Sequence, residues 1–373
     1  MWYQILVIIF FVLYYVCRVL YGDRFATEYR IGDCVLYRPT LHTKERMPKN
    51  DVIFCLIVAI LLAYTNGSKG TGVGIDTVRH MSQYAVTGGF DTLTKAFSTR
   101  NEEYGFVAIM YVMNKLGFSF ELYTFTYTLV SMLLIARVLS RYSYNLPVSY
   151  AIYVLFGLFI NCNMGTVRQG IAMSLTFYAF DLIMQDKKYK YFLVMAIAFM
   201  FHTSSLVFLP MYWIIRIPYN RNTKVGIIVL EFCGYVFKGP LMKLAIPFLN
   251  QDFGAREAGG QKMYLFYIAL LLFTMYIFEI KQIQSKVGLF YLYSLALAVF
   301  FTPMASANPA YYRMLYYFTI FFTLLIPYLN REMKGTSLKI GFNCSFVFVM
   351  IYYFATQIIP YSAYPYYFNW QQY

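Results

Sequence analysis

The chain has 373 residues, of which 60% are hydrophobic and only 13% are charged. A soluble domain of this size carries roughly 25% charged residues, so the composition excludes an ordinary soluble fold. The formal net charge is +14, which we attribute to basic loops at the cytoplasmic side of a membrane rather than to nucleic-acid binding.

Apolar runs recur along the chain, and each is long enough, or nearly so, to cross a hydrocarbon core of about 30 Å as a helix. The first run lacks a basic n-region and a small-residue cleavage site, so we interpret it as a retained span, not a signal peptide. We predict an all-α, polytopic membrane protein forming one integral membrane domain over residues 1–373. The predicted spans, about 12 in number, are residues 4–20, 51–65, 120–137, 147–162, 166–184, 189–201, 203–216, 225–249, 263–280, 287–304, 311–329 and 340–359, with 189–216 as one kinked helix the alternative.

The positive-inside rule orients these spans. The 21–50 loop is rich in Lys and Arg, and alternation then places five further basic loops on the same side, near residues 137–141, 187–190, 216–224, 281–286 and 331–339. The agreement of these loops requires both termini outside and an even number of spans.

Residues 66–119 form the predicted long external loop, which is glycine-rich and partly helical from Thr77 to Tyr84. Its last part, residues 106–118, is apolar but interrupted by Asn114 and Lys115. A full crossing by this segment would invert every later loop, so we predict a re-entrant or surface-lying segment.

The first external loop carries ionisable groups that are not loop anchors. Asp76, Arg79 and His80 lie at i, i+3 and i+4, so they share one helix face, and Tyr84 follows one turn later. Asp76 and His80 lack a third ligand at suitable spacing, and the scattered cysteines form no CxxC pair, so we predict no metal site. Glu102 and Glu103 precede the apolar 106–118 segment; either carboxylate is a candidate base or arginine partner, or an ordinary solvated charge.

Two arginines stand where apolar helices are predicted to begin on the outer side. Arg168 is flanked by polar residues, including Gln169, which a simple interfacial anchor does not need. A helix start combined with a guanidinium is suited to bind an anion. Arg313, in a run of aromatic residues with Tyr312, resembles an interfacial belt on its own but forms a candidate pair with Arg168.

His202 interrupts an apolar stretch at the outer end of two predicted spans. Histidine titrates near neutral pH and is suited to proton transfer. The alternative is a structural histidine that bonds to a nearby serine or backbone group. The aromatic C-terminal segment from residue 360 is consistent either with interfacial anchoring or with stacking on sugar rings.

The order of these motifs resembles the EpsG family of Wzy-type polysaccharide polymerases. The resemblance covers residues 60–370 and rests on Gly74-x-Asp76, Glu103-Tyr104-Gly105, Arg168-Gln169-x-Ile171-Ala172, Phe201-His202-x-Ser204 and Tyr312-Arg313. The family more often has proline after its glutamate, where Tyr104 stands here, so either Glu102 or Glu103 is the corresponding residue.

The resemblance implies a metal-independent, GT-C-like membrane glycosyltransferase without cofactors. It would join undecaprenyl-pyrophosphate-linked oligosaccharide repeat units by inverting transfer at the outer face of the bacterial cytoplasmic (inner) membrane. Its partners would be the lipid bilayer, this lipid-linked substrate, and a chain-length regulator and a flippase as candidates, with no nucleic acid. The implied roles are pyrophosphate binding by Arg168 and Arg313, base catalysis by His202 with Glu103 or Asp76 as alternatives, and substrate binding by Arg79, His80, Tyr84, Glu102, Gln169 and Tyr312.

Three other functions compete with this interpretation. A transporter or flippase of the lipid-linked sugar would favour internal repeats and charges at the bilayer midplane, neither of which the sequence contains. A membrane O-acyltransferase of polysaccharide would also use an intramembrane histidine but has less need of paired arginines. A ligase that moves finished polymer to another acceptor shares the chemistry.

Overall fold

The computed structural model describes residues 2–21, 29–31, 34–36, 49–74, 76–245, 261–359 and 366–371. Several predicted anchors of the first basic loop, including Arg24, Arg38, Lys44 and Arg46, lie outside the described residues, as does the first part of the aromatic C-terminal segment.

The described chain is mainly helical. The first half contains α1 (Trp2–Tyr21), β1 (Tyr29–Ile31), β2 (Cys34–Leu36), α2 (Lys49–Gly67), α3 (Thr77–Gly88), α4 (Leu93–Thr99), α5 (Tyr104–Lys115), α6 (Phe120–Tyr142), α7 (Leu146–Leu155), the π-helix η1 (Phe159–Gly165) and α8 (Val167–Met184). The second half contains α9 (Lys188–Phe201), the 3₁₀ helix η2 (Thr203–Phe208), α10 (Met211–Ile214), α11 (Arg221–Val236), α12 (Lys238–Ala245), α13 (Gln261–Ile280), α14 (Lys286–Ala307), η4 (Pro309–Tyr311), α15 (Tyr312–Thr319), α16 (Phe322–Glu332), α17 (Thr336–Tyr353), η5 (Phe354–Ile358) and η6 (Asn369–Gln371).

Each predicted span contains helix, and the apolar helices identify the protein as a membrane protein. Among the described residues, five helices (α2, α6, α13, α14 and α17) are long and apolar enough to cross a membrane, or up to eight if each bent pair is one span. This number is below the predicted value of about 12, because α9 has only 14 residues and α8 carries polar residues in its first turn and Asp181 near its end. The count of 12 therefore stays a prediction.

Three of the predicted spans are broken. α7 and η1 meet at 64°, α11 and α12 at 83°, and α15 and α16 at 45°. The first break lies at Gly157, whose φ of +70° is a left-handed conformation that glycine adopts without strain. The predicted 189–216 segment is also interrupted, because His202 has an extended backbone and ends α9. This interruption favours two segments over one long kinked helix.

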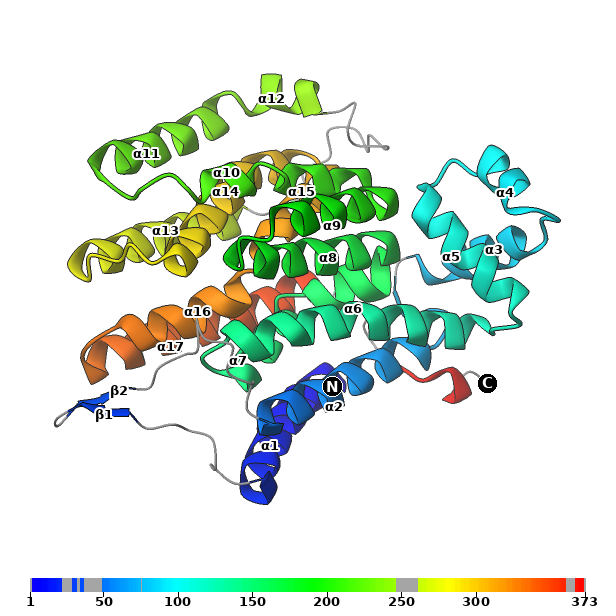
Figure 1. Ribbon diagram of the computed structural model, residues 1–373, viewed down its shortest axis with the longest axis horizontal. Helices are drawn as coiled ribbons and strands as arrows, with labels where there is room; N and C mark the ends of the chain where they lie inside the picture. Colours follow the sequence, from blue (N-terminus) through cyan, green and yellow to red (C-terminus); the bar gives the residue numbers. More distant parts are fainter. Residues whose placement is uncertain are drawn as a thin grey trace.

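The helices pack side by side, with α2 along α6, α6 along α8 and α8 along α9. On the far side of this group α13 packs against α14, and α11 covers α14, which is the most buried of the apolar helices. The short helices α3, α4 and α5 gather beyond one end of α6, α8 and α9, whereas the antiparallel β1–β2 pair lies at the opposite end (Figure 1). With 12 residues, α5 is about 18 Å long, too short for a core of about 30 Å, which supports the prediction that 106–118 does not cross.

The end of the C-terminal segment returns to the end of α2. Gly70 N donates to Tyr367 O at 2.9 Å, and Asn369 N donates to Ser68 O at 2.9 Å. Tyr366 donates its hydroxyl to Thr65 O at 2.7 Å and stacks on Trp2 at 5.8 Å. These aromatic side chains therefore pack within the molecule.

A buried carboxylate joins the C-terminal ends of α6 and α8. Asp181 on α8 is fully buried and accepts a hydrogen bond from the Tyr142 hydroxyl at 2.7 Å. It also forms ion pairs with Arg137 at 3.3 Å and Arg141 at 3.1 Å. The cluster thus fixes the α6–α8 contact at the end away from α3–α5.

We expect Asp181→Ala to lower the free energy of unfolding by about 1–3 kcal/mol, because it removes the acceptor of the buried Tyr142 hydroxyl and the partner of two partly exposed guanidinium groups. Thermal unfolding of the purified protein in detergent measures this change. The control is Asp91→Ala, whose side chain is 82% exposed in its pair with Lys95 and whose loss costs at most about 1 kcal/mol. Equal unfolding midpoints for the two variants would contradict the prediction.

Candidate active site

The centre of the candidate site is the carboxylate of Glu103, directly before α5. Its oxygen Oε2 accepts a hydrogen bond from Arg168 Nη1 at 2.5 Å, and Oε1 lies 3.0 Å from His202 Nδ1. Glu103 and His202 are both buried, with 8% and 5% of their surface exposed. One carboxylate therefore joins the start of α5, the start of α8 and the junction of α9 with η2.

The ionisation of Glu103 determines the protonation pattern of His202. Burial raises the pKa of Glu103, but the hydrogen bond from His202 and the charge of Arg168 outweigh it and lower the pKa to about 2. The carboxylate is then ionised at neutral pH and can only accept, so His202 Nδ1 must be the donor. In a neutral imidazole this leaves the lone pair on Nε2, the nitrogen that can take a proton.

Arg168 enters the site from the first turn of α8. Its side chain is only 19% exposed, and its guanidinium carbon lies 5.7 Å from the centroid of the Phe106 ring. The amino end of a helix carries partial positive charge, which adds to that of the guanidinium. The predicted anion-binding combination of a helix start and an arginine is therefore present in the geometry.

Arg313 reaches the same region from α15. The neighbouring Gln169 side chain donates from Nε2 to the Arg313 carbonyl oxygen at 2.7 Å, which ties the start of α8 to α15. Arg313 interacts electrostatically with Arg168, Glu103 and Asp76. The structure thus brings together Arg168, Arg313, His202 and Glu103.

Glu102 and Glu103 bind different side chains. Its two oxygens accept from Arg100 Nε and Nη2, each at 2.9 Å, and Gln83 Nε2 donates to Oε1 at 2.7 Å. Of the two adjacent glutamates, Glu103 is therefore the one that contacts Arg168 and His202.

The remaining predicted residues surround this centre. Asp76 caps the start of α3 without a side-chain cap bond, and Arg79 is exposed on α3. Tyr84 is buried, donates its hydroxyl to Phe118 O at 2.8 Å and stacks on Tyr123, contacts that favour a structural role. Tyr312 is half-buried and packs against Tyr316.

His80 uses both ring nitrogens within the protein. Nε2 lies 3.1 Å from Gly165 O, and Nδ1 lies 3.1 Å from Gln83 Oε1. Neither nitrogen is then available to a metal without breaking a buried hydrogen bond. In the described part of the chain no group of three or more His, Cys, Asp or Glu side chains could hold a metal ion.

Side chains from three other segments hold the main chain that leads into α8. Each donates to a carbonyl oxygen at the end of η1 or at the first residue of α8. The pairs are Asn66 to Asn163 O at 2.9 Å, Lys69 to Met164 O at 2.8 Å, His80 to Gly165 O at 3.1 Å and Tyr127 to Val167 O at 2.6 Å. These contacts fix the main chain directly before Arg168 and Gln169 and so position both side chains.

The sequence did not predict roles for Asn66, Lys69 and Tyr127, because none of them lies in a motif or interrupts an apolar run in an unusual way. Lys69 follows a span at its outer end, as an interfacial anchor would, yet only 7% of it is exposed. Burial lowers the pKa of Lys69 to about 7. One feature of the sequence could have indicated its role: Lys69 lies on the predicted outer side of the membrane, where positive charges are few.

The glycine two residues after Glu103 has a steric role. A Cβ atom at Gly105 would lie 2.8 Å from the carbonyl oxygen of Met200, near the end of α9. Glycine therefore allows α5 to approach α9 closely enough for Glu103 to contact His202, which gives the Glu-x-Gly pattern a physical reason.

A family model described as EpsG family matches residues 52–373. Neither the curated proteins nor the solved structures contain a match to this chain.

We expect Gly105→Ala to lower the free energy of unfolding by about 1–3 kcal/mol, because the methyl group forces α5 away from α9. Thermal unfolding in detergent tests this. The matched control is Gly226→Ala on α11, where an added Cβ meets nothing within 4 Å and where alanine is the better helix former. A Gly105→Ala protein as stable as the control would show that the contact is not tight.

Proposed function

The chain belongs to the EpsG family over residues 52–373, a family of membrane proteins of polysaccharide biosynthesis, and we propose that it polymerises lipid-linked oligosaccharide repeat units. The observation that carries this proposal is the contact of Glu103 with both His202 Nδ1 and Arg168. It combines an oriented base with a cationic site in one buried cluster, as glycosyl transfer from a pyrophosphate requires.

The base in this proposal is His202. The acceptor is a sugar hydroxyl of the incoming lipid-linked unit, and its oxygen attacks the anomeric carbon of the growing chain. His202 Nε2 takes the hydroxyl proton, while Glu103 holds the Nδ1–H and stabilises the imidazolium that forms. Glu103 is ionised, with its pKa lowered to about 2 by the contacts that outweigh burial, so it orients the base and is itself a weak one.

The leaving group is the lipid pyrophosphate. As the bond between the anomeric carbon and the phosphate oxygen breaks, negative charge develops on the pyrophosphate and requires fixed positive groups. Arg168 and Arg313 supply them, since a guanidinium binds phosphate oxygens through two parallel hydrogen bonds. Because arginines meet this charge, we propose that no metal ion is needed, and direct attack by the acceptor implies inversion at the anomeric carbon.

The site would face the outside of the bacterial cytoplasmic membrane. The positive-inside rule places the basic loops in the cytoplasm. The candidate site is built at the starts of α5 and α8 and the end of α9, on the side of the molecule where α3–α5 gather and away from β1–β2 (Figure 1). Undecaprenyl pyrophosphate is the carrier we propose. Asp76, Arg79 and Tyr312 lie on or near the start of α3 and α15 and are candidates for contacts to the sugars, whereas Gln169 is fully buried and positions α15. The GT-C-like arrangement is part of this proposal.

The glycans of a deletion strain distinguish this function from its rivals. Loss of a polymerase should leave single repeat units on the lipid carrier at the outer leaflet, detectable by mass spectrometry of extracted lipids. Units confined to the inner leaflet would indicate a flippase, normal polymer without acyl groups an O-acyltransferase, and polymer retained on the lipid carrier a ligase. Each of these three outcomes would overturn the proposal.

The purified enzyme tests the two central roles. In an assay with lipid-linked repeat units and excess EDTA, His202→Ala should lower polymer formation at least about 100-fold, the contribution typical of a general base. Arg168→Lys keeps the charge and loses the planar fork, so we expect a loss of about 10-fold or more. The control is Arg221→Lys at the exposed start of α11. Full activity of either site variant would contradict the role assigned to that residue. Inactivation of the wild type by EDTA would contradict the proposal that no metal ion is needed.

A further inference from the structure

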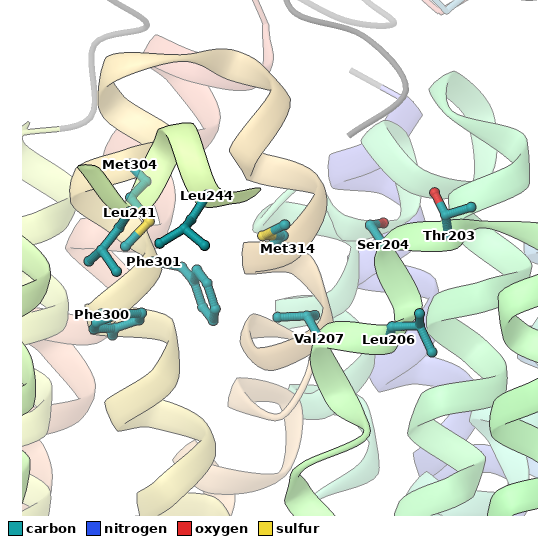
Figure 2. Close-up of a pocket in the computed structure, with 10 residues that line it drawn as sticks. All are labelled: Thr203, Ser204, Leu206, Val207, Leu241, Leu244, Phe300, Phe301, Met304 and Met314. Carbon is teal, nitrogen blue, oxygen red and sulfur yellow. The ribbon is translucent and has the colours of Figure 1, made fainter. Parts of the chain in front are cut away.

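An apolar pocket lies directly beside the candidate active site. It has a volume of about 340 Å³ and lies between η2, α12, α14 and α15 (Figure 2). Apart from Thr203 and Ser204, its lining consists of leucine, valine, phenylalanine and methionine side chains. Such a lining binds hydrocarbon and offers almost nothing to a sugar or a phosphate.

The polarity of the pocket changes along its length. Thr203 and Ser204 lie at one end, Val207, Phe301 and Met314 in the middle, and Leu241 of α12 toward the other end (Figure 2). The Ser204 hydroxyl lies 3.2 Å from the hydroxyl of Tyr317, one turn after Arg313. The polar end is therefore the end that adjoins the candidate active site.

Two pairs of consecutive residues connect the pocket to that site. His202 precedes Thr203, and Arg313 precedes Met314, so each active-site residue is one Cα–Cα step, about 3.8 Å, from a residue of the pocket wall. A ligand with a charged head at Arg313 and an apolar chain attached to it could occupy both regions at once.

We propose that this pocket binds the isoprenoid units nearest the pyrophosphate of the lipid-linked donor. The inference rests on the proposed function, which supplies a donor with an apolar tail joined directly to the group that Arg168 and Arg313 would hold. Flexible Met304 and Met314 side chains suit the branched, irregular surface of an isoprenoid. The rest of the isoprenoid chain would enter the bilayer past α12 and the bend before it, where Leu244 of α12 is 73% and Phe237 at the bend 51% exposed.

The bend between α11 and α12 forms one wall of this pocket. The 83° break turns α12 away from the direction of α11, so that Leu241 and Leu244 of α12 line the cavity opposite η2. A straight continuation of α11 would carry these residues elsewhere. In this proposal the break between α11 and α12 allows α12 to form a wall of the lipid-binding pocket.

Photolabelling of the full-length protein in detergent tests the binding site independently of turnover. The probe is a polyprenyl pyrophosphate with a diazirine on its first isoprene unit. We expect labelled peptides at residues 203–207, 300–304 or 314, and loss of label with excess unlabelled polyprenyl pyrophosphate. Labelling only elsewhere, or equal displacement by a phospholipid with saturated acyl chains, would overturn the proposal.

A pocket-filling variant tests the same site through kinetics. Val207→Trp should raise the KM of a donor with a long isoprenoid about 10-fold, and leave that of a donor whose pyrophosphate carries one methyl group unchanged. The matched control, Leu272→Trp on α13, changes a residue that is 56% exposed and should affect neither donor. Equal KM increases for both donors would contradict the proposal, because they would show that the substitution does not act through the isoprenoid chain of the donor.

These outcomes separate the two proposals. Labelling at the pocket in a protein that forms no polymer from any donor would support the lipid site and refute the polymerase. Normal polymerisation by Val207→Trp with the long donor, together with no label at the pocket, would refute the lipid site alone.

Discussion

The candidate site depends on how the chain pairs the carbonyl oxygens at the end of η1 and at the first residue of α8. In a membrane interior an unpaired carbonyl is costly, and a continuous helix is the usual solution. Here the helix is interrupted, and Asn66, Lys69, His80 and Tyr127 donate to the carbonyls of residues 163, 164, 165 and 167. The interruption places a helix start, with its partial positive charge, inside the protein, and Arg168 projects from that start.

The charges of the site balance in a way that favours an anionic ligand. Glu103 neutralises one guanidinium, that of Arg168, and keeps His202 in the tautomer that leaves Nε2 able to accept a proton. Arg313 adds a second positive charge within electrostatic range of both. With His202 neutral, the guanidinium groups of Arg168 and Arg313 outnumber the Glu103 carboxylate, and a pyrophosphate can bind these two cations while the base stays unprotonated; Asp76 is a further carboxylate within range of Arg313.

The sequence predicted the helical membrane class and the approximate positions of the helices, and it singled out the four residues that the structure brings together around Glu103, because apolar runs and misplaced charges are local signals. It did not predict which glutamate contacts His202, since Glu102 and Glu103 are adjacent and only the direction in which the chain enters α5 separates them. Lys69, Asn66 and Tyr127 escaped notice because their roles depend on carbonyls about 40 to 100 residues away. The breaks within three predicted spans were likewise not predicted.

The pocket and the charged cluster meet at the junctions between His202 and Thr203 and between Arg313 and Met314. Hydrocarbon and ionised groups require opposite environments, so a lipid pyrophosphate needs a protein surface whose polarity changes over about one bond length of the ligand. A 3₁₀ helix that begins directly after His202 and a short helix that begins directly before Arg313 allow that change over a short stretch: Met314 directly follows Arg313, and Leu206 follows His202 after three small polar residues. The same junctions would hold the reacting bond at a fixed depth, because the tail cannot move toward the cations and the pyrophosphate cannot enter the pocket.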